Sequence, residues 1–229
     1  MKEADLLEHY PRLWHMAEDG SFESIRKNGL LSATALLDLY GVSGKEREML
    51  ERRHRPQCVT ITKKGLPDAV IRDQKPMREG PLAGCLMDGL TPADWYEMLN
   101  ERVFFWLSRH RLRSLLGARA YRDRPHVVLT VDSASLVNAH RDRIELSPLN
   151  SGATLYNPLP RGLATFSAID DFPFEERRKT RSIAASVVEL VVRGGVPDIG
   201  DHLIAAHRVH NENREELWRK EGTAEDDGP

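Results

Sequence analysis

The sequence predicts an α+β fold with a mixed or antiparallel sheet, for three reasons. Helical patterns are concentrated in the first half of the chain, and short runs of apolar and β-branched residues are spread through the rest. The regular alternation of strand and helix that is typical of a parallel sheet is absent. The chain also has neither a GxGxxG motif after a strand nor a GxxxxGK[ST] motif, so no dinucleotide fold of that kind and no P-loop is predicted.

The predicted helices are supported by their end signals. Ser21 and Gly29 have the residue types of an N-cap and a C′ residue around one helix. Thr91, Pro92 and Asp94 have the order of a capped helix start, with proline at the first helical position. The predicted helices cover residues 4–13, 22–28, 32–40, 43–57, 91–100, 109–121, 135–138 and 197–204.

The predicted strands are short apolar runs. HVVLTV at residues 126–131 is the strongest of them, and VVELVV at 187–192 is rich in β-branched residues. The remaining predicted strands cover residues 13–16, 59–61, 103–106, 144–146 and 165–169.

The length of 229 residues suits one large domain, which we expect over residues 1–209. Within it, residues 63–89 are rich in glycine, proline and charge, which predicts a long functional loop or an insertion. Residues 210–229 are polar and charged, and we expect them to form a flexible tail.

The composition gives no support to several classes of protein. The 33 basic and 35 acidic residues give no overall case for nucleic-acid binding. The arginine-rich stretch 109–124 is either a local phosphate-binding track or an ordinary solvated helix face.

Cys58 and Cys85 form no zinc or disulfide pattern, and His207 and His210 lack further ligands nearby, so no metal site is predicted. No signal peptide and no run of apolar residues that could span a membrane is recognised, so we expect a cytoplasmic protein without membrane contact.

Two polar residues stand inside apolar strand patterns. Glu189 lies in VVELVV, where a buried carboxylate is costly unless it is paired or faces a cavity. Alternation on a half-exposed strand would instead point it to solvent. His15 lies between Trp14 and Met16. It is either a ligand-binding group or a neutral imidazole whose hydrogen bonds are made within the core.

An aromatic run occupies the predicted strand RVFFW at residues 102–106. Because neighbours on a strand alternate between faces, Phe104 and Trp106 share one side and Phe105 takes the other. One side must be core, and the other is either core or a stacking surface for a planar heterocycle. The later loop around Asn150, Ser151 and Gly152 has small polar residues that suit a ligand or an ordinary turn.

Three segments together resemble the ADP-ribosyltransferase superfamily, in particular its DarT-like, nucleic-acid-modifying branch. They are LWHMAEDGSFESIRKNGLLS at residues 13–32, the aromatic strand RVFFW, and VVELVV followed by Val196 and Pro197. The resemblance implies an ADP-ribosyltransferase-like split sheet that holds NAD as co-substrate. It also implies that the acceptor is an intracellular molecule, first of all a nucleic-acid base. The protein would then be a toxin or defence factor, with an antitoxin or immunity protein as partner.

The resemblance also implies roles for single residues. Glu189 would be catalytic, binding the 2′-hydroxyl of the nicotinamide ribose and stabilising the cation that forms as the glycosidic bond breaks. The cofactor-binding residues would be His15, Met16, Ala17, Arg102, Phe104, Phe105 and Trp106. Other candidates for an arginine that binds the NAD phosphates are Arg47, Arg52, Arg53 and Arg161.

The chain departs from the family pattern at two positions. Ala17 stands where a threonine is common, which leaves one hydrogen bond to NAD in doubt. Val187 stands where arginine-modifying relatives have a second glutamate, which turns the expected acceptor away from arginine side chains. Two alternatives remain open from the sequence: a non-catalytic module that binds a nucleotide or a partner, and an enzyme that hydrolyses NAD or transfers a phosphate group.

Overall fold

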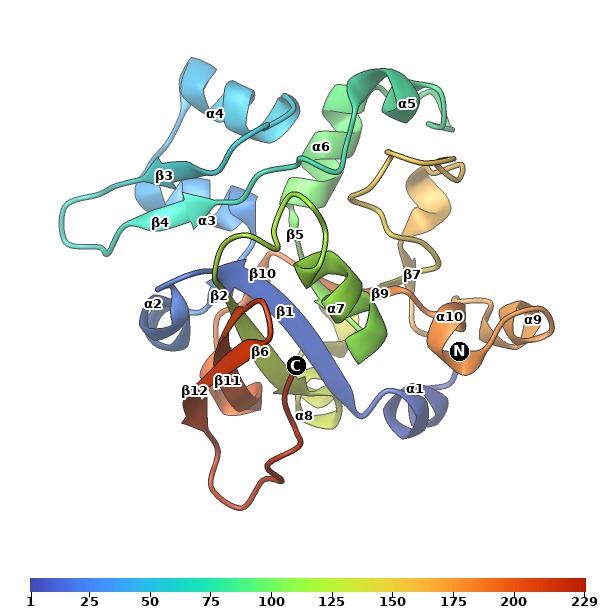
Figure 1. Ribbon diagram of the computed structural model, residues 1–229. Coiled ribbons are helices and arrows are strands. Elements are labelled where there is room, and N and C mark those ends of the chain that lie inside the picture. The colour runs from blue at the N-terminus through green and yellow to red at the C-terminus, as the bar shows by residue number, and fades with distance from the viewer.

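An eight-stranded sheet, in the order β12-β11-β6-β1-β5-β9-β7-β8, forms the centre of the computed structural model, which describes all residues 1–229 (Figure 1). Every neighbouring pair in it is antiparallel. The predicted α+β class and the antiparallel sheet are therefore confirmed. Its strands are β1 (Arg12–Glu18), β5 (Arg102–Trp106), β6 (His126–Asp132), β7 (Ile144–Ser147), β8 (Ser167–Ala168), β9 (Glu189–Arg193), β11 (Leu203–His210) and β12 (Asn213–Arg219).

Two small antiparallel sheets lie beside the large one. The first pairs β2 (Leu30–Leu31) with β10 (Gly195–Val196), and the second pairs β3 (Val59–Ile61) with β4 (Ala69–Ile71). The helices are α1 (Glu3–His9), α2 (Phe22–Asn28), α3 (Ala33–Tyr40), α4 (Gly44–Arg52), α5 (Glu79–Ala83), α6 (Pro92–Asn100), α7 (Arg109–Leu116), α8 (Ser133–His140), α9 (Phe174–Arg178), α10 (Ile183–Ser186) and α11 (Ile199–His202), with 3-10 turns at Arg141–Arg143 and Leu163–Thr165. No helix has the length and apolar character needed to cross a membrane.

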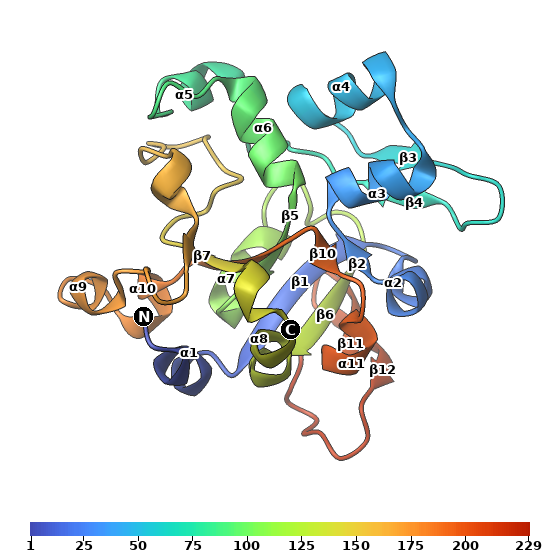
Figure 2. The same cartoon turned by 180° about the vertical axis from the view of Figure 1, so that it is seen from behind.

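Helices cover both faces of the large sheet. The helix α7 lies on one face, where Leu112 packs with Trp14 and Val128, and α8 and α11 lie on the other (Figures 1 and 2). The largest core cluster, of 26 buried residues, lies on this second face and includes Leu129 of β6 and Leu136 of α8. Because both faces are covered, β6 is buried almost throughout.

The sheet divides between β1 and β5. The ladder joining these strands holds a single residue pair, Trp14 with Trp106. Beyond that pair β1 continues to Glu18 along β6, and β5 continues back to Arg102 along β9. The two strands therefore separate within the sheet and leave an opening between their remaining residues.

Most predicted elements are present, and the helix start at Thr91 is confirmed in detail. The Asp94 amide donates to the Thr91 hydroxyl at 3.3 Å, and the Thr91 amide donates to the Asp94 carboxylate at 2.9 Å. Other boundaries were too long. The helices predicted over 4–13, 43–57 and 109–121 end earlier, and that predicted over 197–204 is one turn that leads into β11.

The expectation of a flexible tail over residues 210–229 is wrong. Residues 213–219 form the edge strand β12, whose backbone pairs with β11 and whose side chains are mostly exposed. Asp227 then makes a bidentate ion pair with Arg12 at 3.0 Å, and the Trp14 indole donates to the Gly228 carbonyl. A polar sequence is misleading here because an edge strand is held through backbone bonds, which leave no apolar signature.

The contact between β2 and β10 depends on a residue without a side chain. Gly195 has φ of +109°, and a Cβ atom there would lie 2.5 Å from the Leu30 carbonyl oxygen. Gly20 also has positive φ, at +77°, but has open space around it. A substitution at Gly20 would therefore cost backbone strain alone, whereas one at Gly195 would cost backbone strain and steric overlap.

We expect Gly195→Ala to destabilise the fold much more than Gly20→Ala. The Gly20 substitution adds only the left-handed backbone cost of about 1–2 kcal/mol. The Gly195 substitution adds overlap with β2, for a total of roughly 3 kcal/mol or more. Urea unfolding measures both, and equal losses in the two variants would contradict the close approach of β2 and β10.

Candidate functional site

A cavity of about 490 Å³ lies at the opening between β1 and β5. Its walls come from residues 15–18 of β1, from β5, from α2 and the segment that follows it, and from the segment that contains β4. Both His15 and Glu189 line it, although they belong to opposite ends of the chain. The volume is within the usual range for small-molecule and cofactor sites.

Glu189 is the first residue of β9 and lies opposite Trp106 of β5. It is 3 % exposed, so a solvent-facing orientation is excluded. Its carboxylate accepts the Ser151 hydroxyl at 2.7 Å and the Ser151 amide at 3.2 Å. Ser151 is fixed in turn, because its carbonyl accepts from the Arg161 guanidinium at 2.9 Å and from the Trp95 indole at 3.3 Å. The carboxylate is therefore held in one position at the cavity wall.

Burial raises the pKa of Glu189 to about 7. The hydrogen bonds from Ser151 and the charges of Arg161 and Arg111 act in the opposite direction but do not cancel the cost of desolvation. Near neutral pH this carboxyl group is consequently divided between its acid and its ionised form. A positive charge brought into the cavity would favour the ionised form.

His15 lies where β1 leaves β5. Its Nδ1 is 2.9 Å from the Phe104 carbonyl oxygen, and since a carbonyl only accepts, Nδ1 carries a proton. Burial lowers the pKa of His15 to about 4, so the ring is neutral at physiological pH. Its Nε2 is then unprotonated and has no hydrogen-bond partner in the protein. The imidazole offers the cavity an acceptor, and its Nδ1–H replaces a missing backbone bond of β5.

The side chains of the aromatic strand alternate between its two faces, as predicted. Phe104 and Trp106 line the cavity and are half-buried, whereas Phe105 is fully buried in the core and does not line it. Phe105 packs against His15, with their ring centres 5.7 Å apart, and so supports a residue of the site without lining the cavity. The expectation that Phe105 itself contacts a ligand is therefore corrected. Met16 and Ala17 both line the cavity, and Ala17 is almost completely enclosed.

Arg102 lines the cavity, but its guanidinium is already committed. It donates to Glu145 at 2.8 Å and to the Met98 carbonyl at 2.6 Å, and it lies over the Phe166 ring. This arrangement disfavours the expected role of Arg102 as a phosphate ligand. The other four candidate arginines do not line the cavity; they are Arg47, Arg52, Arg53 and Arg161.

Two arginines that the sequence did not single out also line the cavity. Arg72 lines the cavity from the segment after β4, and its Nη1 lies 2.9 Å from Glu18. Arg55 also lines it, and burial lowers its pKa to about 10. Its guanidinium is committed, because it donates to the Arg72 and Leu50 carbonyls and to the Asn100 side chain. Their position depends on the β3–β4 hairpin, which brings part of the expected loop 63–89 to the cavity. No motif in the sequence predicts that placement.

The arginine-rich stretch 109–124 is only partly free. Arg109 donates to the Gly228 carbonyl, Arg113 to the Pro229 carbonyl, and Arg124 lies 3.1 Å from Asp73. These contacts rule out one continuous row of unpaired arginines. Arg119 is exposed and has no ion pair, and it lies between Leu115 and Tyr121, which both line the cavity.

A model described as a family of unknown function, DUF7002, matches residues 11–203. No curated protein matches the chain. The matched segment includes β1, β5 and β9, so all the cavity residues described above lie inside the shared domain.

The buried carboxyl group makes the stability of the protein depend on pH. Because the folded pKa of Glu189 lies above its unfolded value, its contribution is complete below about pH 4.5 and is lost as pH rises through about 7. We expect Glu189→Gln to gain stability relative to wild type across this window, by about 3 kcal/mol in all. Urea unfolding of both proteins at pH 5 and pH 8 measures the change, and a constant difference would show that Glu189 is ionised throughout.

Proposed function

The chain belongs to the DUF7002 family of unknown function, and we propose that it is an NAD-dependent ADP-ribosyltransferase whose catalytic residue is Glu189. The observation that carries the proposal is that His15 and Glu189 line one cavity at a division of the sheet. The resemblance of three sequence segments to ADP-ribosyltransferases supports the same activity. An ordinary structural role for both residues would not require a shared cavity.

The chemistry required is cleavage of the bond between C1′ of the ribose and the nicotinamide nitrogen. The bonding pair leaves with neutral nicotinamide, and the ribose ring takes up the positive charge in an oxocarbenium-like state. A fixed carboxylate beside the ribose stabilises that charge. The acceptor then attacks C1′ with its lone pair and releases a proton to solvent.

Glu189 has the properties that this step needs. Its carboxylate is held by Ser151 in a dry wall of the cavity, where an electrostatic interaction is stronger than in water. The pyridinium of NAD is itself cationic, so its binding would lower the pKa of Glu189 from about 7 and favour the ionised form. Binding of NAD would thus favour the ionised form of Glu189, which is the form that stabilises the transition state.

His15 and the aromatic residues supply orientation in this proposal. The Nε2 of His15 accepts a hydrogen bond from a ribose hydroxyl or from the carboxamide of NAD, since Nδ1–H is occupied by Phe104. Phe104 and Trp106 provide an apolar wall for the nicotinamide ring. Arg72 is the cation available for the phosphates, because only its Nη1 is bonded to other side chains. The Ala17 side chain forms no hydrogen bond, so NAD would be held without the contact that a threonine side chain would make there.

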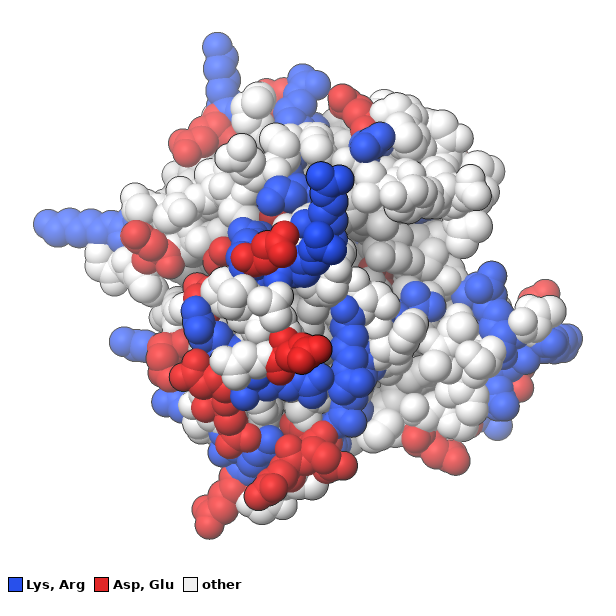
Figure 3. All heavy atoms as spheres, in the orientation of Figure 1, with Lys and Arg blue, Asp and Glu red and all other residues white.

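A nucleic-acid base is the acceptor that we propose. Basic side chains gather over α7 and the loop that follows it, with acidic ones between them (Figure 3). Arg119 and Arg122 are exposed there, next to the cavity wall formed by Leu115 and Tyr121. A phosphate backbone bound at this edge would bring a base to the cavity. Such an activity belongs to a cytoplasmic toxin or defence factor, controlled by an antitoxin or immunity protein.

We expect Glu189→Gln to bind NAD normally but to transfer ADP-ribose about 10²- to 10³-fold more slowly. The purified protein is incubated with NAD labelled in its adenine, with single- or double-stranded DNA, with RNA, or with lysate. Glu212→Gln, an exposed position at the β11–β12 turn, is the matched control. Release of nicotinamide without labelled acceptor would instead indicate NAD hydrolysis, and NAD binding without turnover would indicate a binding module.

We expect His15→Asn to weaken NAD binding about tenfold, because one hydrogen bond from the ligand loses its acceptor. Titration calorimetry measures the affinity, and thermal unfolding confirms that the variant is folded. His210→Asn, at the end of β11 and away from the cavity, serves as control. Equal affinity in wild type and His15→Asn would remove His15 from the site.

A further inference from the structure

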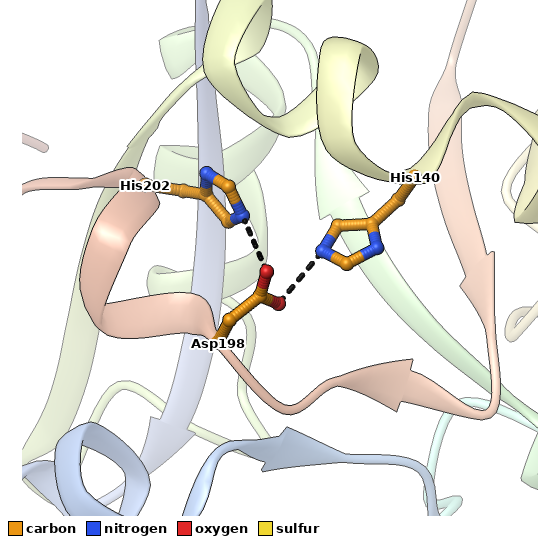
Figure 4. Close-up of side chains that lie close together, drawn as sticks. All are labelled: His140, Asp198 and His202. Atoms are coloured by element: carbon orange, nitrogen blue, oxygen red, sulfur yellow. Dashed lines mark hydrogen bonds and ion pairs between the residues drawn. The ribbon is translucent and has the colours of Figure 1, made fainter.

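A second cluster of ionisable side chains lies outside the cavity. His140 ends α8, Asp198 precedes α11, and His202 ends α11 (Figure 4). One nitrogen of each histidine and a carboxylate oxygen all lie within 4.8 Å of one another. None of the three residues lines the cavity, so the cluster is independent of the proposed function.

The side chains converge on one point. His140 Nε2 is 2.7 Å from Asp198 Oδ1, and His202 Nε2 is 3.4 Å from Asp198 Oδ2. The two imidazoles are almost completely buried, and the Asp198 side chain is 40 % exposed. The cluster is therefore closed on the protein side and open to solvent at the carboxylate.

His202 provides the second observation that points to a ligand. Its Nδ1 is 2.6 Å from the Ser135 hydroxyl, which fixes the orientation of the ring. Its Nε2 is buried, faces Asp198 and has no hydrogen-bond partner. An imidazole oriented through one nitrogen with the other left free is the usual arrangement of a metal-binding histidine.

We propose that His140, Asp198 and His202 bind a divalent transition-metal ion, with Zn²⁺ the best match. Two imidazole nitrogens and one carboxylate oxygen are ligands that zinc accepts, and three protein ligands leave a tetrahedral position for water on the exposed side of Asp198. Magnesium is disfavoured, because it prefers oxygen ligands. The sequence predicted no metal site because the ligands come from separate segments without a metal-binding motif.

Arg143 competes with the ion in this arrangement. Its Nη2 lies 2.7 Å from His140 Nδ1, and since a guanidinium only donates, Nδ1 accepts and the proton resides on Nε2. That Nε2–H donates to Asp198. Coordination requires the proton to move from Nε2 to Nδ1, which requires Arg143 Nη2 to turn away. The Arg143 Nη1 stays bonded to the Gly195 carbonyl at 2.8 Å.

The bound ion would join α8 to α11. The segment that leads into α11 lies against the end of α2. A Cβ atom on Gly29, the residue that follows α2, would be 2.6 Å from Pro197. Residues Ser24, Ile25 and Asn28 of α2 line the cavity. The ion therefore would stabilise the support behind one cavity wall without touching a ligand there.

The test uses the full chain, freed of metal by a chelator and dialysed. We expect Zn²⁺ to raise its Tm and to bind at a single site by titration calorimetry, while Mg²⁺ does neither. Co²⁺ in place of Zn²⁺ should give visible absorption bands of tetrahedral coordination. Absence of a Tm shift with Zn²⁺ would overturn the proposal.

Variants assign the ligands. Asp198→Asn and His202→Gln should each weaken Zn²⁺ binding more than about tenfold, and the Asp198 side chain is partly exposed. His210→Gln removes an imidazole outside the cluster and should leave the affinity unchanged. Wild-type affinity in both cluster variants would assign the ion to other residues and refute the site. Arg143→Gln should bind Zn²⁺ more tightly, and weaker binding would contradict the competition.

Discussion

The separation of β1 from β5 is the constraint on which the rest of the site depends. Continued pairing beyond Trp14 and Trp106 would close the sheet and fill the cavity with backbone. The backbone groups released by the separation must find other partners, because unpaired buried groups are costly. The Phe104 carbonyl finds one in the His15 ring. The imidazole thus replaces a strand partner for this carbonyl, and His15 lines the cavity that the separation leaves.

The buried carboxylate of Glu189 is the second cost that the fold carries. Burial opposes its ionisation, and Ser151 compensates through its hydroxyl and its amide. Ser151 is held in turn by Arg161 and Trp95, which connect the carboxylate to the packed helix α6. An apolar residue of similar size would avoid this cost of desolvation.

Local signals in the sequence predicted most of the elements, because capping residues and short apolar runs act within a few residues. The Thr91 cap and the alternation of Phe104, Phe105 and Trp106 are examples. Features set by distant partners were not predictable: β12 is polar and is held by β11, and Arg102 is occupied by Glu145. Glu189 and His15 were identifiable as polar residues in apolar strands, but only the structure brings them to one cavity.

The cavity and the histidine cluster lie on different sides of the segment around Pro197, and this segment links them physically. Gly29 ends α2 against Pro197, and Gly195 holds β10 against β2, both at distances that no side chain would permit. A shift of α11 would therefore displace α2 as well, because the packed backbone atoms cannot move closer together. The cluster on α8 and α11 fixes one side of this contact, and α2 forms the cavity wall on the other. An ion bound at the cluster would therefore stabilise the position of the wall that a ligand in the cavity would meet.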